Sequence, residues 1–98
     1  MDALQVLAEP RRRKILSLVR DRERSAGEIA GHFDITFGAV SQHLSVLRDA
    51  GFVSVRKDGN HRLYSLDEDG LGRWRPVLEA MWSEFLDDLA AAVEDVDA

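Results

Sequence analysis

Apolar residues follow a helical spacing over the first twenty positions. Leu4 and Leu7 share one side of a short helix that this pattern predicts over residues 2–8. Pro10 fits the first turn of a second helix, where its missing N–H has no bond to lose. The apolar side of that second helix carries Ile15, Leu16, Leu18 and Val19. The segment 20–24, RDRER, is polar and is expected to be a break.

Two further helical patterns, joined by a break of about three residues, follow in residues 25–50. Ser25 and Glu28 form an S-x-x-E capping box, which closes two free N–H groups of a first helical turn. The helix that follows is expected to bury Ile29, Ala30 and Phe33. Thr36 is a good N-cap for the next helix, and Gly51 lies where a glycine would end it. The buried stripe of this helix is Val40, Leu44 and Leu47. Together the pair predicts a helix-turn-helix.

The outward side of the second helix of this pair carries short polar side chains. Ser41, Gln42 and Ser45 are too short to form good ion pairs along a helix. They suit a flat, hydrogen-bonding surface such as the edges of bases in a DNA groove. Gly38 and Ala39 would let the helix backbone come close to such a surface.

The apolar period changes to two in residues 52–66, which predicts a β-hairpin. Asp58 and Gly59 form a typical two-residue hairpin turn. With this turn centre, Val53 pairs with Tyr64 and Val55 pairs with Arg62. The tip of the hairpin then displays Lys57, Asn60 and His61.

The remaining residues, 67–95, predict a last helix. Three acids in a row, beginning at Asp67, suit a helix N-terminus. Gly70, Gly72 and Pro76 weaken the first turns, so a kink or break near residue 76 is expected. The large apolar residues then recur three or four apart at Leu71, Trp74, Leu78, Met81, Trp82, Phe85, Leu89 and Val93. A stripe this broad is more than a small domain can cover, which favours a dimer interface.

These elements predict one mainly α domain over residues 1–98 with a small β-hairpin wing, in the order α-α-α-α-β-β-α. That order is typical of a winged helix-turn-helix, with the helix-turn-helix at 25–50 and the wing at 52–66. Residues 1–8 and 67–95 are the expected dimerisation helices. Their predicted interface residues are Leu4, Leu7, Leu71, Trp74, Leu78, Met81, Trp82, Phe85 and Leu89.

The charge is distributed unevenly along the chain. Residues 1–75 hold all thirteen Lys and Arg and eleven acids, a net charge of +2. Residues 76–98 hold seven acids and no base, which makes the whole chain −5. An acidic C-terminal segment can coexist with a DNA-facing surface if the two point apart, although it lowers non-specific affinity for DNA.

Four stretches, LAEPRRRKIL, AGEIAGHF, VSQHLSVLRDAGFV and RLYSL, resemble the ArsR (arsenic-repressor-like) winged-helix repressors. The resemblance covers roughly residues 2–66. It implies a homodimer that pairs through its first and last helices and binds a palindromic operator in double-stranded DNA. It also implies that Phe37, Gly38, Ser41 and Gln42 lie near bases.

Side-chain chemistry extends this set of DNA-facing residues. Gln42 suits the N6 and N7 atoms of adenine, whereas Arg48, Lys57 and Arg62 suit phosphates by their length and charge. For His43, contact with DNA and packing under the hairpin are equally good readings. The predicted DNA-facing set is Thr36, Phe37, Gly38, Ser41, Gln42, His43, Ser45, Arg48, Lys57, Asn60, His61 and Arg62.

The sequence indicates no metal site and no cofactor. It has no cysteine, so the segment SAGEIAGHF lacks the CxC-type motif of metal-sensing relatives, and residues 67–98 contain no histidine ligand. The aromatic residues Trp74, Trp82 and Phe85 could instead line a pocket for a small-molecule effector, but a dimer core is the preferred reading.

Other functional classes find little support in the sequence. No serine is placed with a histidine and an aspartate as a nucleophile, and neighbouring acids such as Asp87 and Asp88 would not face one cleft. No glycine-rich phosphate loop is present either, so no enzyme is expected. No apolar run forms a signal peptide or a membrane span, which with the absence of cysteine favours a cytoplasmic protein with no membrane partner. The alternative to DNA binding is a winged-helix module for protein–protein interaction.

Overall fold

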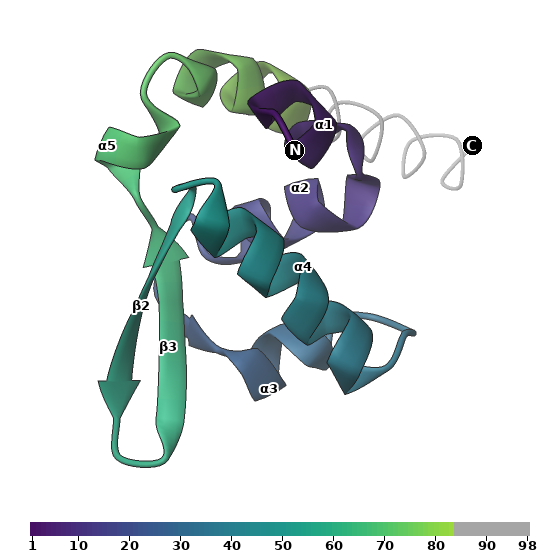
Figure 1. Cartoon of the computed structure of the whole chain (residues 1–98), viewed down its shortest axis with the longest axis vertical. Coiled ribbons are helices and arrows are strands. Elements are labelled where there is room, and N and C mark those ends of the chain that lie inside the picture. Colours follow the sequence, from purple (N-terminus) through teal and green to yellow (C-terminus); the bar gives the residue numbers. More distant parts are fainter. Residues whose placement is uncertain (84–98) are drawn as a thin grey trace, which may run out of the picture.

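The computed structural model describes residues 1–83 and has the predicted winged helix-turn-helix architecture (Figure 1). The elements in chain order are α1 (Ala3–Ala8), α2 (Pro10–Leu18), β1 (Arg24–Ser25), α3 (Ala26–Ala30), α4 (Phe37–Asp49), β2 (Val53–Asp58), β3 (His61–Leu66) and α5 (Glu68–Leu71). Residues 74–83 form a further helical segment. The hairpin tip lies at one end of the molecule, and α1 and segment 74–83 lie at the other.

The helix caps are those that the sequence predicts. Ser25 and Glu28 form the complete capping box of α3, and the Thr36 hydroxyl accepts a hydrogen bond from the Ala39 N–H at 3.1 Å. Gly51 follows the C-cap of α4 with a φ of +83°, which a glycine adopts without strain. The ends of the helix-turn-helix are therefore encoded locally.

The core lies where α2, α3 and α4 meet the base of the hairpin. The predicted stripe of α4, Val40, Leu44 and Leu47, is buried to 0–1% exposure. It packs with buried residues of the other elements, namely Ile15, Leu16, Val19, Ile29, Phe52, Val53 and Tyr64. Because α4 is held on this one face, its opposite face is left outward.

The sheet has a third strand that the sequence analysis did not predict. Residues 20–24 were expected to be only a polar break, but β1 pairs antiparallel with β3 and gives the strand order β1-β3-β2. A strand of two residues shows no alternation, so its pairing depends on a partner about forty residues away in the chain. The side chain of Glu23 reinforces the sheet by binding Arg56 of β2 through two oxygens, one of them at 2.9 Å from Nε.

The hairpin register differs from the predicted one by two residues. Val53 pairs with Leu66 and Val55 with Tyr64, so the turn centre is Gly59–Asn60 instead of Asp58–Gly59. Gly59 has a φ of +63°, and no described non-glycine residue has a positive φ, as in a turn with glycine at its first central position. This register matches apolar residues across the strands, whereas the predicted one paired Val55 with Arg62.

The predicted last helix is broken earlier than expected. Helix α5 ends at Leu71, and Gly72, with a φ of +49°, turns the chain before segment 74–83 begins. Pro76 therefore falls in the first turn of that segment, where a proline is tolerated. Asp67 caps α5 by accepting a hydrogen bond from the Gly70 N–H at 2.9 Å.

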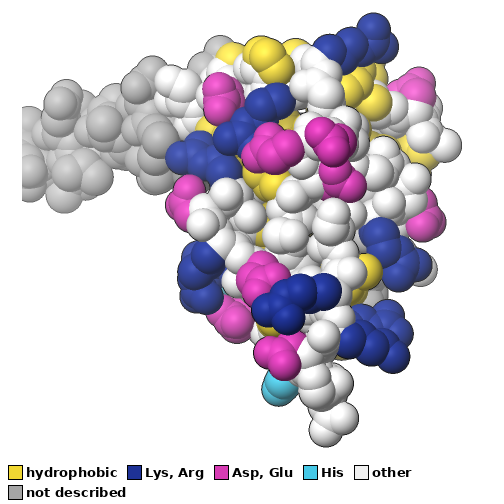
Figure 2. Space-filling model, turned by 90° about the vertical axis from the view of Figure 1, so that its left-hand side faces the viewer, with side chains coloured by type: hydrophobic (Ala, Val, Ile, Leu, Met, Phe, Trp, Pro, Cys, Tyr) yellow, Lys and Arg dark blue, Asp and Glu magenta, His cyan; other side chains and the backbone are white. Residues whose placement is uncertain are grey.

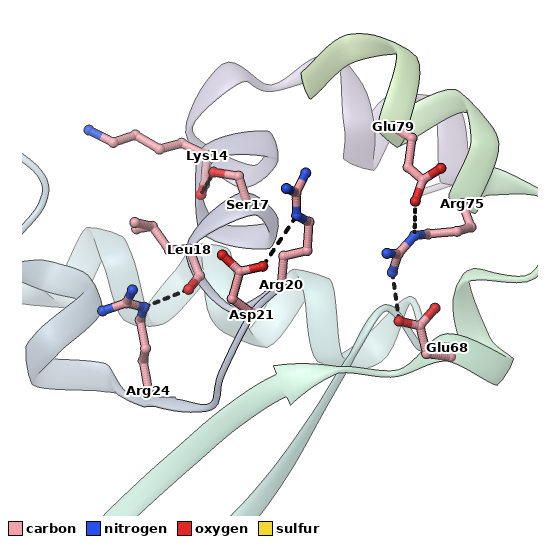
Figure 3. A network of polar contacts seen from close by, with 9 residues as sticks. All are labelled: Lys14, Ser17, Leu18, Arg20, Asp21, Arg24, Glu68, Arg75 and Glu79. Carbon is pink, nitrogen blue, oxygen red and sulfur yellow. Dashed lines mark hydrogen bonds and ion pairs between the residues drawn. The ribbon is translucent and has the colours of Figure 1, made fainter. Parts of the chain in front are cut away.

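Arginine side chains tie the helices together (Figure 3). Arg75 of segment 74–83 binds Glu68 of α5 at 2.6 Å and Glu79 at 3.0 Å. Its guanidinium also lies 5.7 Å from the centre of the Trp82 ring, and that of Arg20 lies 4.9 Å from it. Both cations therefore lie close to Trp82, one of the aromatic residues of the effector hypothesis, which stays a prediction.

Candidate nucleic-acid interface

The outward face of α4 is built from residues that the core does not use. At 100° per residue, Gly38, Gln42 and Ser45 lie roughly opposite the buried Val40 and Leu44. Gln42 and Ser45 are exposed, as is Arg48 near the end of the helix. Within residues 1–83 the side chains of Gln42 and Ser45 make no hydrogen bond to the protein, so their polar atoms are free for an external partner.

Ser41 and His43 lie on the two flanks of this face and are half-buried. His43 lies near the start of α2, where the charges of Glu9, Arg12 and Arg11 act on it. Its two predicted roles, contact with DNA and packing under the hairpin, stay predictions. Burial lowers the pKa of His43 below its usual value, and the nearby Glu9 carboxylate opposes that shift only in part.

This lowered pKa gives a pH dependence to the stability of the domain. The unfolded chain binds the His43 proton more tightly than the fold does, so the contribution is fully present above about pH 6.5 and is lost below it. We expect a lower thermal midpoint at pH 5.5 than at pH 7.5. The variant His43→Gln should reduce that difference. An equal difference in the variant and in the wild-type chain would contradict this role of His43.

Two basic side chains of the wing face each other across the strands. Lys57 pairs directly with Arg62, on the sheet face that carries Val55 and Tyr64 nearer the core. Like charges in this position destabilise a strand pair, and neither side chain has an ion-pair partner within residues 1–83. They line an open hollow of about 280 Å³ at the hairpin tip together with Gly59, Asn60 and His61. This arrangement suits an anion such as a phosphate group.

Arg56 of the wing is less free to bind an external anion, because its guanidinium already pairs with Glu23. Its hydrogen bonds to Glu23 raise the pKa of the guanidinium and lower the pKa of that carboxyl group. The sequence analysis missed this pair, because no local pattern joins two residues 33 positions apart. Figure 2 shows acidic and basic side chains interspersed on the side of the molecule that carries α5 and the hairpin.

Some residues predicted for the dimer interface are buried within one chain, whereas others are exposed. Leu7, Leu71 and Leu78 are 0–1% exposed and Trp82 is 7% exposed, so these side chains fill the core of one chain and leave almost no area for a partner. Leu4 is 64% exposed, and Trp74 and Met81 are half-buried. Phe85 and Leu89 lie outside the described residues.

Exposed apolar residues gather at the end of the molecule that carries α1 and segment 74–83 (Figure 1). They include Met1, Leu4 and Val77. The sequence analysis did not include Val77, although it lies three residues after Trp74 and four before Met81. This end lies opposite the hairpin tip, so a partner chain bound there would leave the wing free.

Two further observations concern only residues 1–83. No group of His, Cys, Asp and Glu side chains in this part of the chain is arranged to hold a metal ion. None of its helices combines the length and the hydropathy that crossing a bilayer requires.

Known proteins that are similar to this chain are transcriptional regulators. Residues 9–55 match the model of the bacterial regulatory protein, arsR family. A Mycobacterium tuberculosis protein described as an HTH-type transcriptional regulator is 36% identical over 95 residues, which cover 96% of this chain and 83% of that protein.

Solved structures agree with these relationships. A possible transcriptional regulator for arsenical resistance is 42% identical with a TM-score of 0.73, covering 94% of this chain and 96% of that one. The homodimeric winged helix-turn-helix DNA-binding domain of a possible ArsR-family regulator from Mycobacterium bovis is 26% identical with a TM-score of 0.69, covering 82% of this chain and 74% of that one.

Proposed function

The chain belongs to the ArsR family of bacterial regulatory proteins, and we propose that it acts as a homodimeric transcriptional repressor that binds a palindromic operator in double-stranded DNA. The observation that carries this proposal is the outward face of α4. Its exposed Gln42 and Ser45 have polar atoms without partners in the described protein, at the position where a recognition helix enters the major groove.

The wing supplies the second contact of the proposed complex. Lys57 and Arg62 would bind the sugar-phosphate backbone beside the groove that α4 occupies, and Arg48 would bind it from the other end of α4. Phosphate contacts hold the protein in register, whereas the α4 side chains read the sequence. The protein-interaction alternative has no such use for a facing pair of unpaired cations.

Dimerisation would place two such surfaces on one face of the particle. We propose that Leu4, Trp74, Met81 and Val77 form the part of the interface that lies within the described residues. A twofold particle presents its recognition helices to successive major grooves about 34–36 Å apart. The operator would then contain two inverted half-sites about 10 base pairs apart, centre to centre.

Selection of duplex fragments from a random library tests the proposal. We expect the full chain to enrich an inverted repeat with this spacing. If no sequence is enriched above the starting library at low salt, the repressor proposal fails. Loss of the protein in its source cell should raise transcription next to the selected site, whereas a fall would mark an activator.

Arg62 provides a test of the phosphate contacts. We expect Arg62→Ala to weaken binding to operator and random duplexes alike, and to reduce the slope of log affinity against log salt by about 0.9 for each protomer. Fluorescence anisotropy over a salt series measures both quantities. The variant Arg62→Lys keeps the charge and should keep the slope. An unchanged slope in Arg62→Ala would show that this side chain does not bind phosphate.

A further inference from the structure

Phe37 is an exposed aromatic residue at the end of α4 that would enter the groove. It is the first residue of the helix and is 56% exposed. The other large exposed apolar residues of the described chain are Met1, Leu4 and Val77, which lie at the opposite end of the molecule. A single exposed phenyl ring is ordinary on a protein surface, so its meaning depends on its position in the helix.

The position of Phe37 at the start of α4 predicts that its ring lies near the bases of bound DNA. In a helix-turn-helix, the N-terminal residues of the recognition helix contact base edges. The adjacent Gly38 has room for a side chain, since an added Cβ would meet only the Thr36 hydroxyl oxygen, at 4.0 Å. Packing within the chain therefore does not require a glycine at 38, although glycine weakens a helix relative to alanine. A glycine at residue 38 is explained if a binding partner comes close to the backbone in the first turn of α4.

One group in the major groove matches the phenyl ring chemically. The edges of the four base pairs present hydrogen-bond donors and acceptors, and the only apolar group among them is the C5-methyl of thymine. We propose that Phe37 is a specificity-determining residue that packs on a thymine methyl group in each half-site of the operator. This inference rests on the proposed function and adds to it one base identity.

The test replaces that methyl group by hydrogen. Each thymine of a selected operator is exchanged for deoxyuridine, which keeps every hydrogen-bonding group of the base pair. We expect one thymine per half-site whose exchange weakens binding of the full chain about fourfold, the loss for one buried methyl-sized group. Exchange in both half-sites should weaken it about 15-fold.

Variants then assign the effect to Phe37. Phe37→Ala should bind the thymine and deoxyuridine operators equally well, and because the residue is exposed, thermal unfolding should show that the variant folds. Ser45→Ala, which is exposed on the same helix, should keep the fourfold ratio whatever its affinity. The ratio between the two operators is the readout, so a general loss of affinity does not imitate it.

The outcomes separate this inference from the proposed function. If no operator is selected, both are wrong. If an operator binds but no thymine exchange matters, or if Phe37→Ala keeps the fourfold ratio, only the role of Phe37 is wrong. A change in the oligomeric state of Phe37→Ala in sedimentation, with an unchanged ratio, would assign the ring to a protein contact and overturn the inference.

Discussion

Replacing Gly70 by alanine is expected to lower the free energy of unfolding by about 3 kcal/mol. The reason is the contact between α5 and the end of α4. A Cβ at residue 70 would lie 1.6 Å from the carbonyl oxygen of Gly51 and 2.7 Å from its carbonyl carbon. Both atoms belong to the backbone, so no side-chain rotation can relieve the overlap. Either α5 or the turn at Gly51 must move.

Thermal unfolding at one fixed protein concentration measures this effect. For a domain of this size, about 3 kcal/mol corresponds to a fall of roughly 12–24 °C in the midpoint. Gly27→Ala is the matched control, because a Cβ there meets only the Ser25 hydroxyl oxygen at 3.9 Å and alanine favours the helix. Equal midpoints for Gly70→Ala and the wild-type chain would show that the two glycines do not pack as described.

Gln42→Ala is expected to weaken operator binding by about 1–3 kcal/mol while leaving binding to random duplex DNA unchanged. The side chain is exposed and has no hydrogen-bond partner within residues 1–83, so the fold does not need it. Alanine is also a better helix former than glutamine, which protects α4 itself. The loss should therefore appear in sequence-specific binding alone.

Competition binding against operator and random duplexes gives the two affinities. Arg62→Ala is the contrasting variant, because a lost phosphate contact weakens both complexes to a similar degree. If Gln42→Ala weakened binding to operator and random DNA equally, its side chain would not be reading a base.

The helix-turn-helix could be predicted from the sequence because its determinants are local. The capping box at Ser25 and Glu28, the cap at Thr36 and the glycine at 51 each act within a few residues of the helix end that they fix. The buried stripe of α4 follows from spacing alone. These same features determine which face of α4 points outward, so the candidate site followed from them.

Features that depend on distant partners could not be predicted in this way. Strand β1 is too short to show a pattern, and Glu23 finds Arg56 only when the sheet forms. Two adjacent turn centres containing Gly59 were both acceptable, and the choice was decided by cross-strand packing of Val53 and Val55.

The degree to which a side chain is buried also depends on the whole fold, so the sequence pattern alone does not determine it. Leu7 and Leu78 continue an amphipathic stripe that suits an interface, yet the same chain covers them completely. The contact between Gly51 and Gly70 likewise has no signature in the sequence, because both residues also have local roles at helix ends.

The most direct test of the central idea follows backbone amide signals of the labelled protein as a selected duplex is added. Recognition through α4 predicts that the largest shifts fall in residues 36–45 and 57–62, while those of α1 stay small, since α1 lies at the opposite end of the molecule. Shifts concentrated in α1 and residues 74–83, with α4 unperturbed, would contradict it.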